Sequence, residues 1–215
     1  MEYVLLSDVG SFSDERISIG HVTVDNYIST ENMVPNTGGV RQASSLPDAK
    51  KVSKYNPGDI LLSNIRPYFK KIWFADCIGG CSNDVLVFHP NKDIDTKFLY
   101  YVLSDNNFFN YATLTSKGTK MPRGDKTSIM QYGVPHYDIV EQKKIACVLR
   151  LLDKKIEFNN KINNNLPPLL CVAQIAAKQR GQTPQTDGCL HTDGQVSGRG
   201  GNEETAEQFT SLLAA

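Results

Sequence analysis

The order of apolar and polar positions along the chain predicts short strands first and helices afterwards. Residues 17–28 alternate apolar and polar side chains and are rich in β-branched residues, which is typical of a half-buried strand. Gly79 and Gly80 predict a turn. Short apolar runs between turn residues predict further strands at 60–65, 72–75, 84–88 and 129–135.

Helical spacing marks two segments. Asp95 is placed to cap a helix that runs through Leu103, and aromatic residues continue to Tyr111. A longer helix is predicted over residues 138–166, which contain neither Pro nor Gly. Its seam residues recur every three or four positions: Ile145, Leu149, Leu152, Ile156, Asn159, Asn163 and Leu166. This coiled-coil spacing predicts a rod of about 40 Å that pairs with a partner. Packing of the same face on the helix's own domain is the alternative.

These elements predict an α+β protein in three parts. A compact mixed domain spans residues 1–137, a coiled-coil-forming spacer helix spans 138–166, and a low-complexity tail spans 167–215. Pro167 and Pro168 end the helix. The tail is rich in polar residues and glycine without apolar periodicity, so we expect it to be disordered.

Composition narrows the functional classes. The 215 residues carry 23 Lys and Arg against 23 Asp and Glu, so no strong overall field indicates a polyanionic or membrane partner. No run of about 18 apolar residues could span a bilayer, and no basic stretch precedes an apolar run at the N-terminus. Five cysteines at irregular spacing argue against a disulfide framework. We therefore expect a cytoplasmic protein without a membrane partner.

Catalytic and metal sites find little support in the sequence. Residues 118–127 are only superficially like a phosphate loop, because an acid and a proline interrupt the cradle. Cys77, Cys81 and His89 lack a fourth ligand for a metal ion. We therefore expect neither a catalytic residue nor a bound metal.

Basic residues nevertheless gather in two segments. Six bases between residues 50 and 71 face only Asp59, and four between 117 and 126 face only Asp125. Residues 63–71 also interleave bases with amides and aromatic rings. Arginine pairs with guanine, asparagine pairs with adenine, and lysine holds phosphates, so this pattern favours DNA binding. A solvated basic face is the alternative.

Four segments occur in an order that resembles a known family: 27–33, 58–71, 80–85 and 118–126. Together with the helix segments 142–146 and 152–157, they resemble the target recognition domain and spacer helix of type I restriction-modification specificity subunits. The resemblance covers about residues 1–166.

The resemblance implies a non-catalytic subunit that selects a double-stranded DNA sequence for adenine methyltransferase subunits, to which restriction subunits add. S-adenosylmethionine, ATP and magnesium are then expected on those partners and not on this chain. The family pattern has two recognition domains joined by two antiparallel helices, whereas one domain and one helix are predicted here. We therefore expect recognition of one half of a bipartite target. The helix is expected to pair with a second copy or with another half-subunit.

Charge and loop position select the candidate DNA contacts, with the two asparagines as base readers: Asn64, Arg66, Lys70, Lys71, Asn83, Lys117, Lys120, Arg123 and Lys126. The tail departs from the family, in which the helix continues past the asparagine-rich segment. A frameshifted or recombined terminus would explain that departure. Two alternatives stay open, namely a coiled-coil interaction module with a merely solvated basic face and an inactive truncated remnant.

Overall fold

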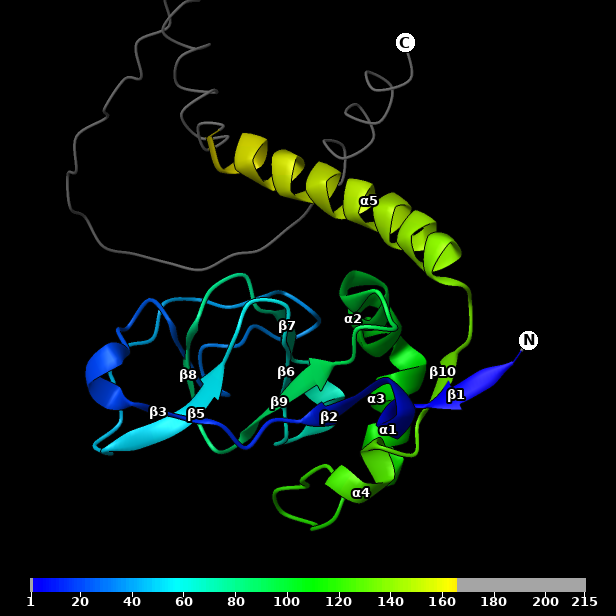
Figure 1. Ribbon diagram of the computed structural model, residues 1–215. Helices are drawn as coiled ribbons and strands as arrows, with labels where there is room; N and C mark the ends of the chain where they lie inside the picture. The colour runs from blue at the N-terminus through cyan, green and yellow to red at the C-terminus, as the bar shows by residue number, and fades with distance from the viewer. Residues whose placement is uncertain (1, 166–215) are drawn as a thin grey trace, which may run out of the picture. The chain divides into compact units, whose positions relative to one another are not determined.

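Short strands form three sheets within residues 2–165, the part of the chain that the computed structural model describes (Figure 1). The central antiparallel sheet has the order β2 (Gly10–Phe12), β9 (Val85–Pro90), β6 (Ile60–Ser63), β7 (Ile72–Phe74). The second sheet has the order β3 (Arg16–Ser18), β5 (Lys51–Tyr55), β8 (Gly79–Cys81), β4 (Tyr27–Ile28). The third pairs β1 (Tyr3–Leu5) with β10 (Gly133–Pro135). The predicted tail at 167–215 lies outside the described residues.

The central strands β6 and β9 are buried on both faces. Since neighbouring residues of a strand point to opposite faces, β6 sends Ile60 and Leu62 into one apolar cluster and Leu61 into another. The first cluster contains residues of α2 (Thr96–Ser104) and α3 (Asn106–Leu114), and the second contains Tyr55 of the second sheet. Figure 1 shows these helices on one side of the central sheet and β5 and β8 on the other. The continuous apolar run of β6 therefore reflects a strand that is buried on both faces of the sheet.

Aspartate side chains begin the helices that cover the sheet. The Asp95 carboxylate accepts a hydrogen bond from the Phe98 N–H at 2.9 Å, which confirms the predicted cap of α2. Asp105 accepts from the Asn107 N–H at 2.7 Å and starts α3 directly after α2 ends. The predicted aromatic cluster is part of α3. Two shorter helices complete the domain, α1 (Leu6–Val9) and α4 (Lys126–Ile129).

The predicted long helix is confirmed as α5 (Ile139–Asn165), and with the sheets it confirms the mixed α and β architecture. Its first turns pack on the domain. Gln142 is buried and accepts from the Asp95 N–H at 2.8 Å, and Ala146 joins the core. From residue 150 onward every described residue of α5 is exposed. There, the Tyr101 hydroxyl donates to Asp153 at 2.6 Å.

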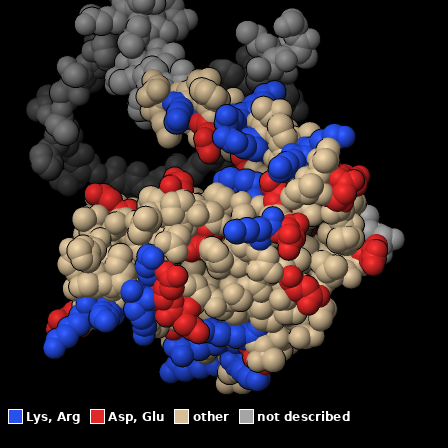
Figure 2. Space-filling model, in the orientation of Figure 1, with Lys and Arg blue, Asp and Glu red and all other residues tan. Residues whose placement is uncertain are grey.

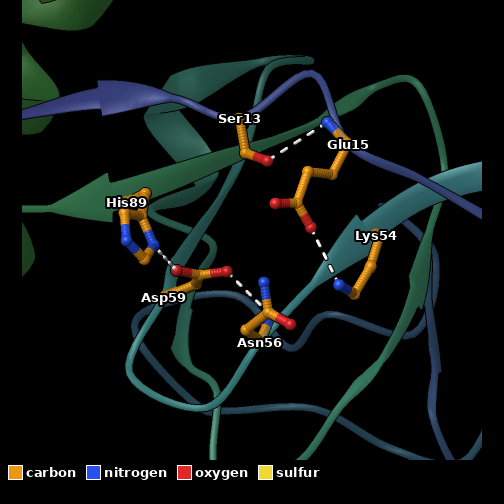
Figure 3. A network of polar contacts seen from close by, with 6 residues as sticks. All are labelled: Ser13, Glu15, Lys54, Asn56, Asp59 and His89. Atoms are coloured by element: carbon orange, nitrogen blue, oxygen red, sulfur yellow. Dashed lines mark hydrogen bonds and ion pairs between the residues drawn. The ribbon is translucent and has the colours of Figure 1, made fainter.

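One buried carboxylate fixes the turn before β6. Asp59 is 1% exposed. Its Oδ2 accepts from the Asn56 N–H at 2.7 Å, and its Oδ1 lies 2.6 Å from His89 Nδ1 (Figure 3). A buried carboxylate without such partners would be strongly destabilising. Nearby, Lys54 on β5 pairs with Glu15 at 2.9 Å, and this contact holds the pKa of Glu15 below its usual range.

Two predicted strands are wrong in part. Residues 17–28 divide into the end of β3, a 3-10 turn η1 (Ile19–His21) and β4. The Asn26 side chain accepts from the Thr23 N–H at 2.6 Å, which closes a turn where the alternation predicted a strand. Over residues 129–135, only the last three positions form a strand, because Asp125 caps the short helix α4 before them.

The turn predicted at Gly79 and Gly80 is also wrong, because both residues belong to β8. A Cβ on Gly79 would lie 2.2 Å from the Asn26 carbonyl oxygen and 2.3 Å from the Tyr55 hydroxyl. Tyr55 donates its hydroxyl hydrogen to that same carbonyl at 2.9 Å. Glycine stands in this strand because backbone and tyrosine approach it closely.

We expect Gly79→Ala to lower the free energy of unfolding by about 1–3 kcal/mol, because the added methyl group overpacks β8. Gly20→Ala is the matched control, since its Cβ would meet nothing nearer than Ser18 Oγ at 4.0 Å. Denaturant unfolding of both variants measures the difference. Equal stability of the two variants would contradict the close approach at β8.

Candidate nucleic-acid interface

The loop of residues 117–126 lies against the end of β6. The Arg66 N–H donates to the Pro122 carbonyl at 2.8 Å, and the Gly124 N–H donates to the Asn64 carbonyl at 2.9 Å. These bonds join the two basic segments, which lie far apart in the sequence, into one surface.

The same loop also closes on itself. Lys117 and Arg123 exchange two backbone hydrogen bonds of 2.9 Å. The Lys117 ammonium lies 2.6 Å from the Asp125 carboxylate and holds the pKa of Asp125 below its usual range. Asp125 in turn accepts from the Thr127 N–H at 3.2 Å at the start of α4. The basic side chains of the loop therefore project from a defined backbone.

Residues 82–84 form a turn, the central turn, which contacts Arg123 of the loop and Arg16 of β3. The Asp84 carboxylate lies 3.2 Å from Arg123 Nη2. Asn83 Oδ1 accepts from Arg16 Nη1 at 2.7 Å. The central turn thus connects the basic loop with β3 of the second sheet.

Six of the nine predicted DNA contacts are exposed: Arg66, Asn83, Lys117, Lys120, Arg123 and Lys126. Four of them lie on the 117–126 loop and the first residue of α4. Figure 2 shows Lys and Arg side chains gathered along the lower edge of this face, where Figure 1 draws α4 and the loop before it. The structure therefore brings these residues together on accessible surface.

The other three predicted DNA contacts, Asn64, Lys70 and Lys71, are half-buried. Both lysines form hydrogen bonds with other residues of the chain. Lys71 Nζ donates to the Thr30 carbonyl at 2.5 Å, and burial lowers the pKa of Lys71. Lys70 Nζ donates to Asn106 Oδ1 at 2.7 Å. Asn64 Oδ1 is buried and has no hydrogen-bond partner among the described residues. Their roles in DNA binding stay predictions.

Left-handed backbone conformations gather beside these residues. Arg66 and Lys70 have φ values of 50° and 52°, and Asn36 and Thr37 have 54° and 57°. The N–H groups of Asn36 and Thr37 donate to the carbonyls of Phe69 and Lys70, both at 2.9 Å. Each such residue costs on the order of 1 kcal/mol or more, and such strain is concentrated at functional sites. The 3-10 turn η2 (Pro67–Phe69) between them exposes two aromatic rings.

Sequence reasoning misses three polar residues beside the central turn. Arg16 reaches Asn83, as described above, while Arg41 and Gln42 line a cleft of about 440 Å³ that Asp84 also borders. No local pattern marks these side chains, because strand pairing places Arg16 and loop contacts place Arg41 and Gln42. The only signal is the long connection between β4 and β5, since long irregular loops are often functional.

Helix α5 exposes a broad apolar face. From Val148 onward, its large exposed apolar residues are between 54% and 65% accessible: Val148, Leu151, Leu152, Ile156, Phe158 and Ile162. Of the predicted seam, Ile145 and Leu149 are half-buried, whereas Leu152, Ile156, Asn159 and Asn163 are exposed. Leu166 lies outside the described residues. The seam prediction therefore omitted a neighbouring apolar stripe, which includes Val148 and Leu151.

Within residues 2–165, no group of three or more His, Cys, Asp or Glu side chains is arranged to hold a metal ion. No helix in that part of the chain is both long and apolar enough to cross a membrane.

A family model described as the type I restriction modification DNA specificity domain matches residues 10–167. Among curated proteins, the EcoDI specificity subunit of Escherichia coli is 31% identical over 93 residues, which are 43% of this chain and 20% of that protein. The HindI specificity subunit of Haemophilus influenzae is 31% identical over 154 residues, which are 65% of this chain and 32% of that protein. The chain thus spans a third or less of the curated relatives' length.

Solved structures show the same fold. The HsdS subunit of Thermoanaerobacter tengcongensis aligns with a TM-score of 0.57 at 20% identity, over 88% of this chain and 51% of that one. The type I restriction-modification S subunit of M. genitalium aligns with a TM-score of 0.54 at 16% identity, over 77% of this chain and 43% of that one.

Proposed function

Because this chain belongs to the type I restriction modification DNA specificity family, we propose that it selects a DNA sequence for a type I restriction-modification complex. The described residues hold one recognition-sized domain and one long helix. The proposed ligand is accordingly one half of a bipartite double-stranded target.

The docking of residues 117–126 on the end of β6 is the observation that carries this proposal. It supplies exposed arginines and lysines beside the amide of Asn83 on one surface. Arginine and asparagine suit base edges in the major groove, and lysine suits phosphates. A local basic surface on a chain with no net charge favours a defined site over general attraction to polyanions.

We infer that the chemistry lies on partner subunits. Adenine methyltransferase subunits would bind S-adenosylmethionine, and restriction subunits would use ATP and magnesium. This chain would contribute DNA choice, without a catalytic residue of its own, in the cytoplasm where those subunits meet bacterial DNA.

The proposed pairing surface is the apolar face of α5. An antiparallel partner helix, from a second copy or another half-subunit, would cover side chains that are now exposed. A helix of 27 residues is about 40 Å long. Two recognition domains held by such a pair would reach DNA sites a helical turn or more apart.

Methylation mapping tests this function directly. We expect bacterial DNA to carry methyladenine in a split, symmetrical motif after co-expression of the full chain with its methyltransferase subunit. Expression of the methyltransferase subunit alone is the control. Absence of any new methylated motif in the co-expressing strain would contradict the proposal.

Arg123→Ala tests base reading within that motif. We expect target binding to fall by about 1–3 kcal/mol relative to binding of random duplex, because arginine discriminates bases and not only phosphates. Arg150→Ala, which removes the same charge from exposed α5, is the matched control. Equal losses on target and random DNA would count against base reading by Arg123.

Leu152→Asp tests pairing through α5. We expect self-association to weaken roughly tenfold or more in sedimentation experiments, because a charge would enter a buried apolar contact. Asn164→Asp is the control, since it introduces the same charge at an exposed position of α5 that lies about 120° around the helix from Leu152. If both variants associate like the unmodified chain, the apolar face of α5 does not pair two copies.

A further inference from the structure

We propose that a polar hollow beside the central turn binds a backbone phosphate of the DNA, with Arg16 and Lys126 as its two cationic contacts. The proposal rests on the DNA-binding function proposed above and deepens it. The hollow has a volume of about 270 Å³, and its polar lining comprises Ser13, Asp14, Arg16, Ser53, Asn83 and Lys126.

Strand pairing assembles this hollow from distant parts of the sequence. Arg16 on β3 lies opposite Ser53 on β5, and Asn83 comes from the central turn. Lys126 begins α4, directly after the basic loop. The site therefore adjoins the candidate interface and is continuous with the surface that carries Arg123.

Arg16 is held in place at one end of its guanidinium group. Its Nη1 donates to Ser53 Oγ at 3.1 Å and to Asn83 Oδ1 at 2.7 Å. A guanidinium group carries five N–H donors, and its planar fork matches two phosphate oxygens at once. With Nη1 anchored by neutral partners, the charge is oriented without being neutralised.

Lys126 supplies the second positive charge. Its Nζ lies 5.8 Å from the centroid of the Phe12 ring, and Phe12 also lines the hollow. Asp14 is the one acid in the lining, so the two cations leave an excess of one positive charge. The hydroxyls of Ser13 and Ser53 add uncharged donors. Two cations with hydroxyls and an amide form a donor set suited to a phosphate.

A phosphate contact here would fix the position of the readers beside it. The same arginine that would hold the phosphate orients the Asn83 amide, and Asn83 neighbours Asp84, which pairs with Arg123. Phosphate contacts set the register of a protein on DNA, whereas base contacts provide sequence choice. Arg16 and Lys126 are therefore expected to act equally on every sequence.

Salt-dependent binding of a random-sequence duplex tests the proposal without knowledge of the target. The full chain and the double variant Arg16→Ala/Lys126→Ala are titrated by fluorescence anisotropy at several salt concentrations. The logarithm of the binding constant falls as the logarithm of the salt concentration rises. Each lost phosphate contact makes this slope less steep by about 1, so the slope of the double variant should be less steep by about 2. We also expect it to bind roughly tenfold or more weakly at low salt.

A charge-matched control separates a contact from general attraction. The double variant Arg150→Ala/Lys144→Ala removes the same charge from exposed positions of α5. We expect it to keep the slope of the unmodified chain. Arg16→Lys should keep the slope and lose affinity, because it retains the charge without the fork. Thermal unfolding checks that every variant is folded.

The outcomes separate this site from the wider function. If the hollow variant and the α5 control have the same slope while Arg123→Ala still loses target preference, the phosphate site is wrong and the DNA-binding function stands. If the unmodified chain binds no duplex at any salt concentration, both are wrong.

Discussion

Two backbone hydrogen bonds between residues 64–66 and 122–124 hold the candidate DNA face together. Without them, the basic loop and the end of β6 would be separate surface segments. Because the bonds use backbone atoms, they are compatible with different side chains at most of these positions. A rigid frame with changeable side chains is what a sequence-specificity domain requires. The central turn extends this frame to the second sheet through Asn83 and Arg16.

Helix α5, in contrast, is attached to the domain by side chains and not by backbone pairing. Buried Gln142 and Ala146 fix its first turns to the domain. The residues beyond expose apolar side chains that water solvates poorly. The start of the helix therefore sets its direction, and the remainder is available to a partner. The proposed recognition face and the proposed pairing face lie on different elements, so under this proposal a change of DNA target would not require a change of partner.

Sequence patterns predict the elements that carry a clear local signal of their own. The apolar run of β6, the cap at Asp95 and the absence of Pro and Gly in α5 each predict the observed element. The strand β5 escapes detection because two consecutive polar residues, Ser53 and Lys54, interrupt the apolar alternation. The contact between the basic segments also escapes, since backbone bonds leave no side-chain pattern. Gly79 shows a related limit, because the same residue type serves turns and close strand packing.

Amide hydrogen exchange of the full chain with and without duplex DNA tests the central claim most directly. If the docked loop and the central turn form the DNA face, amides in residues 64–66, 82–84 and 117–126 should exchange more slowly in the complex. The exposed end of α5 should be unchanged, since it is assigned to a protein partner. Slower exchange confined to α5, with none at the loop or the central turn, would contradict the assignment of the DNA face.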